Sequence, residues 1–262
     1  MKYLLIHAVD ETRLEDLPPQ IGSELAAWAE EMVARGIELD GARLHPSSSA
    51  TTVRAPRGEV QVTDGPFAET KEQIAGYDVI DCPDLDTAVA VASAHPTTRI
   101  GSIEVRAFDD DMPQPHVPEH PAEGKRRYLM LVCADMRQAM AEAMADGMAG
   151  APLPPDDPAP EPEVKRFDED DEDDDPMGIE TWIDNVSDRR LYGWPLVLPN
   201  EAVTVRRIDG HVVTTDGPFA ETKEQVGGYD LLECTDLDAA IDAAATHPVA
   251  AHGVLEIRPV RD

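Results

Sequence analysis

Acidic and basic side chains gather in an eleven-residue segment, TDGPFAETKEQ, which occupies residues 63–73 and returns unchanged at residues 215–225. Glu69 and Glu72 are three positions apart, so they would share one face if the segment were helical. Two carboxylates held close together beside Lys71 have pKa values that are pushed apart, which supplies an acid and a base. The candidate catalytic residues are therefore Asp64, Glu69, Lys71 and Glu72, with their counterparts Asp216, Glu221, Lys223 and Glu224.

The same segment also has a structural interpretation. Asp-Gly-Pro is turn chemistry, because the aspartate accepts a local backbone hydrogen bond, glycine frees φ and proline fixes it. Phe67 would then fill a core, while the charged side chains satisfy one another and cap backbone groups. Because all eleven residues occur in both copies, both copies meet one shared demand, which is either structural or chemical.

Three histidines are candidates for proton transfer or ligand binding. His7 lies on an apolar β run, and its ordinary pKa near 6.5 suits proton transfer; the alternative is a histidine satisfied inside a cavity. Its counterpart is Val132, so an active His7 would make one copy active. His95 and His247 end a predicted helix in each copy, where an imidazolium would cap the helix carbonyls; proton transfer or ligand contact is the alternative.

Two arginines on the last predicted strand of each copy are candidate ligand contacts. Arg106 follows Glu104 by two residues, and Arg258 follows Glu256 in the same way. A guanidinium is a bidentate donor, so these arginines would clamp a carboxylate ligand. The alternative is a cross-strand ion pair at the protein surface.

The identical segments belong to a longer tandem repeat. Matches at the same spacing continue through Gly76-Tyr77-Asp78 and its counterpart at 228–230, as far as Glu104 and Glu256. We therefore expect a first domain at 1–108, a linker at 109–124 and a second domain at 125–262. The second copy holds a predicted helix at 135–148 and an insert at 151–178 with seven prolines and twelve acids. We expect the insert to be disordered, either as a solubilising loop or as an electrostatic tail.

Each copy has the pattern of an α+β unit. Apolar alternation and helical spacing predict the order β-α-β-β-β-β-α-β, with strands near 2–8, 42–45, 51–54, 59–63, 76–82 and 103–106 and helices at 21–35 and 85–95. The order indicates a mainly antiparallel sheet with helices on one face. The bare sheet faces of the two copies would cover each other, giving an internal pseudo-dimer with a small-molecule cavity between the sheets.

Composition excludes several classes of function. The chain has 262 residues, and 53 acidic against 22 basic side chains give a net charge of −31, which opposes nucleic-acid and anionic-membrane binding. We find no run of about 18 apolar residues, and we expect the apolar stretch at residues 3–6 to be a strand and not a signal peptide; three scattered cysteines suit a reducing cytoplasm. Because the motifs of nucleotide, metal and serine-hydrolase sites are missing from the sequence, we expect neither a cofactor nor a metal site.

The Asp-Gly-Pro-Phe-Ala-Glu-Thr-Lys-Glu segment resembles the DGPF-type branch of the YCII-related family, and the resemblance extends over both halves of the chain. It implies ferredoxin-like units that pair into a dimeric α/β barrel. It also implies bacterial proteins of largely unestablished activity, some encoded beside or fused to extracytoplasmic-function sigma factors. An enzymatic role is suspected for the family from a His/Asp pair in a cleft; the matching region here reads His95-Pro96, without an aspartate before the proline.

Two hypotheses about function follow. The first is a binding or regulatory module that holds a small ligand or a protein partner, with a sigma factor as the partner that the resemblance implies. The alternative is a small-molecule enzyme that uses the acid–base carboxylates in the cavity between the sheets. Burial of those carboxylates beside a histidine would favour the enzyme, and bonds to backbone N–H groups would favour a scaffold.

Overall fold

A computed structural model describes residues 1–16, 18–109, 112–135 and 178–261. The predicted helix at 135–148 and the predicted disordered insert at 151–178 lie almost entirely outside these residues. Elements up to β6 form the first unit, and elements from β7 onward form the second unit. The first unit comprises β1 Lys2–Val9, α1 Ile21–Ala34, β2 Glu38–Arg43, β3 Thr51–Arg54, β4 Gln61–Asp64, β5 Gln73–Asp81, α2 Leu85–Ala94 and β6 Gly101–Ala107. The second comprises β7 Arg126–Ala134, α4 Ile179–Asn185, β8 Arg190–Pro195, β9 Val203–Ile208, β10 His211–Asp216, β11 Gln225–Cys234, α5 Leu237–Ala245 and β12 Val254–Pro259.

Aspartate caps begin helices α2 and α5, and an apolar stripe buries one face of α1. Asp84 caps α2 by accepting the Thr87 backbone N–H, and Asp236 caps α5 in the same way. Helix α1 buries Trp28 and Met32, and Gly36 follows it with φ of +66°. Within the described residues, no helix combines the length and the apolar character that a membrane crossing needs.

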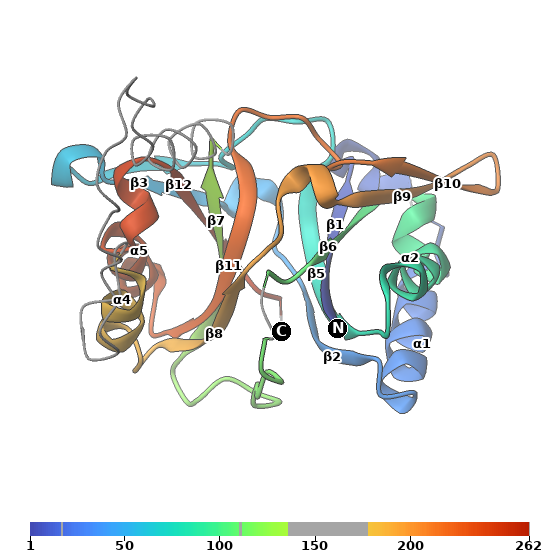
Figure 1. Cartoon of the computed structure of the whole chain (residues 1–262), viewed down its shortest axis with the longest axis horizontal. Helices are drawn as coiled ribbons and strands as arrows, with labels where there is room; N and C mark the ends of the chain where they lie inside the picture. Colours follow the sequence, from blue (N-terminus) through green and yellow to red (C-terminus); the bar gives the residue numbers. More distant parts are fainter. Residues whose placement is uncertain (17, 110–111, 136–177, 262) are drawn as a thin grey trace, which may run out of the picture.

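The two units exchange a β-hairpin. One sheet has the order β10-β9-β6-β1-β5-β2 and the other β4-β3-β12-β7-β11-β8, and all neighbouring strands are antiparallel. The hairpin β3–β4 of the first unit therefore extends the second unit's sheet, where Val53 is paired with Leu255. In return, β9–β10 of the second unit extends the first unit's sheet, where Val205 is paired with Ile103 (Figure 1). Each sheet is completed by the other unit.

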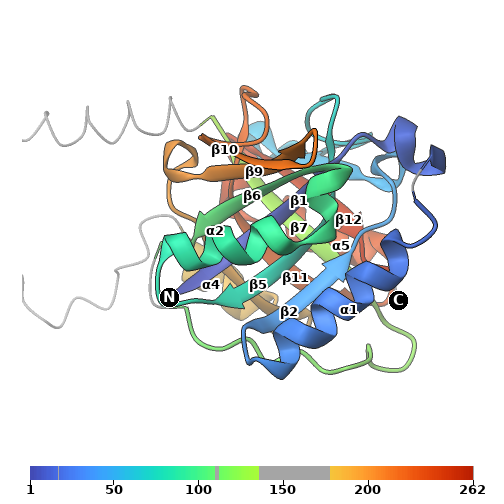
Figure 2. The ribbon, with the colours of Figure 1, turned by 90° about the vertical axis from the view of Figure 1, so that its right-hand side faces the viewer.

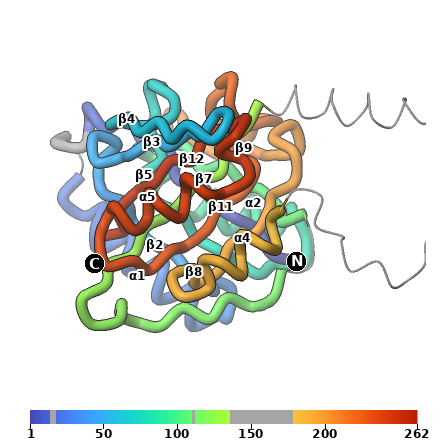
Figure 3. Tube along the Cα trace, turned by 90° about the vertical axis from the view of Figure 1, so that its left-hand side faces the viewer, coloured from blue at the N-terminus to red at the C-terminus, as the bar shows by residue number. Residues whose placement is uncertain are grey.

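The sheets pack face to face, and the helices cover their outer faces. Helices α1 and α2 lie over the first sheet (Figure 2), and α4 and α5 lie over the second (Figure 3). The core between the sheets draws buried side chains from both units, including Ile6, Val79, Leu131 and Leu231. The prediction of an α+β protein with two antiparallel units is thus confirmed. Neither sheet closes on itself, because each is an open row of six strands.

Candidate functional site

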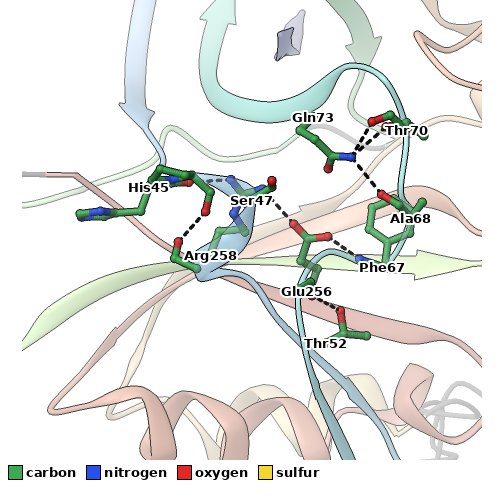
Figure 4. A network of polar contacts seen from close by, with 12 residues as sticks. His45, Ser47, Thr52, Phe67, Ala68, Thr70, Gln73, Glu256 and Arg258 are labelled. Carbon is green, nitrogen blue, oxygen red and sulfur yellow. Dashed lines mark hydrogen bonds and ion pairs between the residues drawn. The ribbon is translucent and has the colours of Figure 1, made fainter. Parts of the chain in front are cut away.

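The two identical segments form loops that are anchored by the opposite unit. Each segment leaves a hairpin strand at a glycine of positive φ, +100° at Gly65 and +97° at Gly217, and continues as bends without a helical turn. The Phe67 N–H donates to Glu256 Oε2 over 2.9 Å (Figure 4). The Phe219 N–H donates to Glu104 Oε2 over 3.1 Å. These bonds are reciprocal, so each loop fixes the exchanged hairpin against the other unit.

Further contacts of the loops account for the glutamine and the second glutamate that both segments contain. The Gln73 amide donates to the Ala68 and Thr70 carbonyls at 3.2 and 2.9 Å, and Gln225 repeats this pattern. Glu72 receives Arg206 of the exchanged hairpin at 3.3 Å, and Glu224 receives Arg54 at 3.1 Å. The repeated segment therefore serves the joining of the units.

The other charged residues of the segments point to solvent. Asp64, Glu69 and Lys71 are exposed, as are their counterparts, and none makes an ion pair or side-chain hydrogen bond with another described residue. The enclosed space between the two loops, lined by Phe67 and Phe219, measures about 20 Å³, which is room for roughly one water molecule. A catalytic role for these carboxylates stays a prediction, and the enclosed space beside them is far smaller than a small-molecule site.

Buried ion pairs occupy the strand arginines. Arg258 donates to Glu256 over 3.0 Å and to the His45 carbonyl over 2.6 Å, and both charged side chains are at most 1% exposed. Arg106 pairs with Glu104 and donates to the Val226 carbonyl over 3.0 Å. Each arginine is therefore paired with the neighbouring glutamate, but the pair is buried and joins two residues of one strand, so the predicted surface cross-strand pair was wrong.

A cluster of His7, Asp78 and His95 lies on the helix-facing side of the first sheet. His7 projects from β1, Asp78 from the neighbouring β5, and His95 follows α2. His7 Nε2 lies 2.9 Å from Asp78 Oδ2, and His95 Nε2 lies 3.6 Å from the same oxygen. All three side chains are at least nine-tenths buried. The cluster therefore lies under α1 and α2, away from the core between the sheets.

His95 is a neutral imidazole whose tautomer is set by its neighbours. Its Nδ1 accepts the Thr97 N–H over 3.2 Å, so the ring proton is on Nε2, which faces Asp78. Burial, reinforced by His7, lowers the pKa of His95 to about 3. His247 accepts the Val249 N–H in the same way, and burial lowers its pKa to about 4. The predicted imidazolium cap was therefore wrong: the rings cap the turn that follows, and they do so uncharged.

A second carboxyl group belongs to this cluster. Glu38 begins β2, and burial together with the nearby charges of Asp78 and Asp40 raises its pKa to about 7. Gly41 makes room for the cluster, because a Cβ there would lie 2.5 Å from Asp78 Oδ1. One carboxyl group that exchanges protons near neutrality thus lies close to a buried His/Asp pair.

The donor set also bears on metal binding. The nitrogen and oxygen atoms of His7, Asp78 and His95 all lie within 4.8 Å of one another, which is compatible with a metal centre. A metal-ligating histidine normally donates its other ring N–H, whereas Nδ1 of His95 is an acceptor. Metal binding through Nε2 would remove the proton from this nitrogen. In a neutral ring that proton would move to Nδ1, and the hydrogen bond from the Thr97 N–H would be lost. The geometry thus favours acid–base chemistry.

The second unit carries an altered copy of the cluster. Val132 replaces His7 and Arg190 replaces Glu38, while Asp230 and His247 are retained. Arg190 Nε lies 2.6 Å from Asp230 Oδ1; burial raises the pKa of Asp230, and Arg190 opposes that rise. A tryptophan packs edge-on against the histidine in both units, with ring centroids 4.3 Å apart for Trp28 and 4.5 Å for Trp182. The packing is preserved, but the complete set of two histidines, an aspartate and a glutamate is found in the first unit's cluster and not in the second's.

Sequence reasoning found His7 and His95 but missed Asp78 and Glu38. Only the residues next to His95 in the sequence were considered as its aspartate partner, whereas Asp78 comes from β5. A usable signal existed, because Asp78 lies directly between Tyr77 and Val79 in a predicted strand and Asp230 repeats it.

The His95→Asn variant is expected to lose less stability on acidification than the unaltered chain. A histidine whose pKa is lowered on folding stabilises fully above its unfolded pKa near 6.5, and this contribution is lost as the pH falls toward 3. Asparagine keeps an acceptor for the Thr97 N–H and does not titrate. Urea unfolding at pH 7 and pH 5 should show the loss reduced by on the order of 1–2 kcal/mol. Equal losses in both proteins would contradict the neutral buried ring.

Comparison with known proteins places these features in a family. The model of the YCII-related domain matches residues 1–109 and 179–262. An uncharacterised protein of Rhizobium meliloti (strain 1021) is 46% identical over 87 residues, covering 32% of this chain and 68% of its own length. The matched ranges contain the first unit's cluster, both anchored loops and, of the second unit's cluster, Arg190, Asp230 and His247 but not Val132. The chain belongs to the YCII-related family, with the domain present in two copies.

Proposed function

We propose that the first unit carries a general acid–base site for a small organic substrate, centred on His7 and Asp78. The observation that carries this proposal is the buried contact of 2.9 Å between His7 Nε2 and Asp78 Oδ2. The equivalent aspartate of the second unit is paired with Arg190 and has Val132 in place of the histidine. The proposed chemistry therefore belongs to one unit, as the pairing of His7 with Val132 in the sequence predicts.

Each side chain of the cluster has a separate role in the proposed proton transfer. His7 accepts a proton from the substrate, and the Asp78 carboxylate orients its ring and stabilises the resulting imidazolium. His95 faces the same carboxylate oxygen with its Nε2–H and stays neutral. Glu38, with a pKa of about 7, is placed to return a proton. The ring nitrogen of His7 and Asp78 Oδ2 are close but not aligned as a hydrogen bond, and such contacts commonly tighten when substrate binds.

Two other features of the sequence analysis enter as proposals. The units form a barrel-like pseudo-dimer of ferredoxin-like halves, which is supported by the shared core and by the bridges Leu44–Val260 and Phe108–Leu196 between strands of different sheets. Binding without chemistry, including binding of a sigma factor, stays a prediction; the buried titratable cluster favours the acid–base function over it.

Proton exchange at carbon tests the proposed function without knowledge of the natural substrate. Small ketones and lactones are incubated with the protein in deuterium oxide, and NMR follows the loss of their acidic C–H protons. We expect acceleration for one of these classes, and a decrease of about 10²–10⁴-fold in the His7→Asn variant. His211→Asn, at an exposed position on β10, is the matched control and should exchange at the original rate. Equal rates in all three proteins would overturn the proposal.

A further inference from the structure

A groove on the outside of the first unit lies next to the buried cluster. It runs between α1 and α2, and its lining includes Trp28, Val91, His95, Arg99 and Arg207. His95 connects groove and cluster, because its ring centroid lies 4.5 Å from that of His7. Arg207 comes from β9, the strand that the second unit contributes to this sheet (Figure 2). The groove is therefore built by both units.

Two backbone carbonyls position the Arg207 guanidinium at the groove. One terminal nitrogen donates to the Ser93 carbonyl over 3.2 Å at the end of α2, and the other donates to the Gly210 carbonyl over 3.0 Å. Among the residues that the structure describes, no acid forms an ion pair with it. A guanidinium has five N–H donors, so these two contacts fix its position and leave donors for a ligand. Arg99, by contrast, is paired with Glu24.

The second unit provides an internal comparison. At the repeat spacing, Arg207 corresponds to Ala55 and Arg99 corresponds to Ala251. Two of the groove's three arginines, Arg99 and Arg207, are thus alanines at the equivalent places around the second unit's cluster; the third, Arg35, is paired with Glu31. These two differences accompany the replacement of His7 by Val132 at the cluster itself. The cationic groove and the titratable cluster are found together on one side of the molecule.

We infer that Arg207 binds the anionic group of a small carboxylate or phosphate ligand whose apolar part packs against Trp28 and Val91. This inference rests on the proposed function, because it assigns the groove as the binding place for its substrate. Carboxylate and phosphate match the guanidinium fork. The chain has a net charge of −31, which repels anionic ligands. The Arg207 guanidinium, which no described acid neutralises, offsets this repulsion locally. The second unit thereby supplies a specificity-determining residue to the first unit's site.

Ligand titration of the whole chain tests this inference. Benzoate, phenyl phosphate and neutral benzyl alcohol serve as probes, and two-dimensional NMR follows the buried Trp28 indole N–H, which donates to none of the residues that the structure describes. We expect saturable binding of at least one anionic probe at millimolar concentration, about tenfold weaker in Arg207→Ala and weakened less in Arg207→Lys, which keeps the charge but loses the planar fork. The matched control Arg57→Ala removes the same charge from the other exchanged hairpin and should leave the affinity unchanged.

The outcomes separate this inference from the proposed function. Preference for benzoate or for phenyl phosphate identifies the anionic group. The inference is overturned if no anionic probe saturates the Trp28 signal, if Arg207→Ala binds as tightly as the unaltered chain, or if Arg57→Ala weakens binding equally. Arg207-dependent binding without any His7-dependent proton exchange would defeat the proposed function alone. His7-dependent exchange without Arg207-dependent binding would defeat the inference alone.

Discussion

The Arg258→Ala variant is expected to lower the free energy of unfolding by about 3–5 kcal/mol, because it leaves a buried carboxylate without its counter-charge. Arg258 is fully buried, and it donates to Glu256 and to the His45 carbonyl. Burial raises the pKa of Glu256, and Arg258 is the main opposing influence, so the variant should push this pKa higher. The deficit should then shrink as the pH falls toward 5, because protonation removes the unpaired charge. Urea unfolding across this pH range measures both effects.

Two further variants separate the loss of a buried charge from the loss of any ion pair. Arg54→Ala removes an arginine from its contact with Glu224, but this arginine is 36% exposed, so a loss below about 1 kcal/mol is expected. A paired replacement, Arg258→Met with Glu256→Gln, leaves no buried charge and should recover part of the stability. The explanation fails if the paired variant is no more stable than Arg258→Ala.

The second large effect is expected from Gly101→Ala. A Cβ at Gly101 would lie 2.0 Å from the Ala8 carbonyl oxygen, so β6 must move away from β1. Displacing backbone in this way costs about 3 kcal/mol of unfolding free energy, since no flexible side chain can give way. Ala8 follows His7, so the displacement also reaches the cluster. Thermal and urea unfolding should show the loss, and the Trp28 NMR signal should shift.

Gly22→Ala is the matched control for the glycine substitution. Nothing lies within 4 Å of a Cβ built on Gly22, which is at the start of α1. Alanine is the better helix former, so this variant should be more stable by about 0.5–1 kcal/mol. A comparable loss in both variants would show that the close approach of β6 and β1 is not the cause.

Much of the fold could be predicted because its causes are local. The helical spacing of α1 and α2 is readable in the sequence, and these helices form at 21–34 and 85–94, close to the predicted ranges 21–35 and 85–95. The hairpin exchange could not be predicted, because β3 has the same alternation whether it pairs within its own unit or with β12. Strand pairing across units is a tertiary choice that leaves no local pattern.

The candidate site was harder to predict because its residues are distant in the sequence. His7 and Asp78 are brought together by the pairing of β1 with β5, and Glu38 by the pairing of β2 with β5. The repeated segment attracted the first interpretation because it is rich in charge and unchanged between copies. One glutamate of each copy, Glu72 or Glu224, contacts an arginine of the exchanged hairpin, which is a structural demand that both copies share.

The hairpin exchange also governs what a shorter protein could assemble. Two separate molecules of the first half would have to lend each other β3–β4, which places Ala55 where the fused chain has Arg207. Such a symmetric assembly would have two histidine sites, and each would lack the guanidinium that Arg207 provides. Covalent fusion keeps two different halves together in a one-to-one ratio. The second half can therefore provide a ligand-binding residue to the first half without carrying a complete histidine cluster of its own.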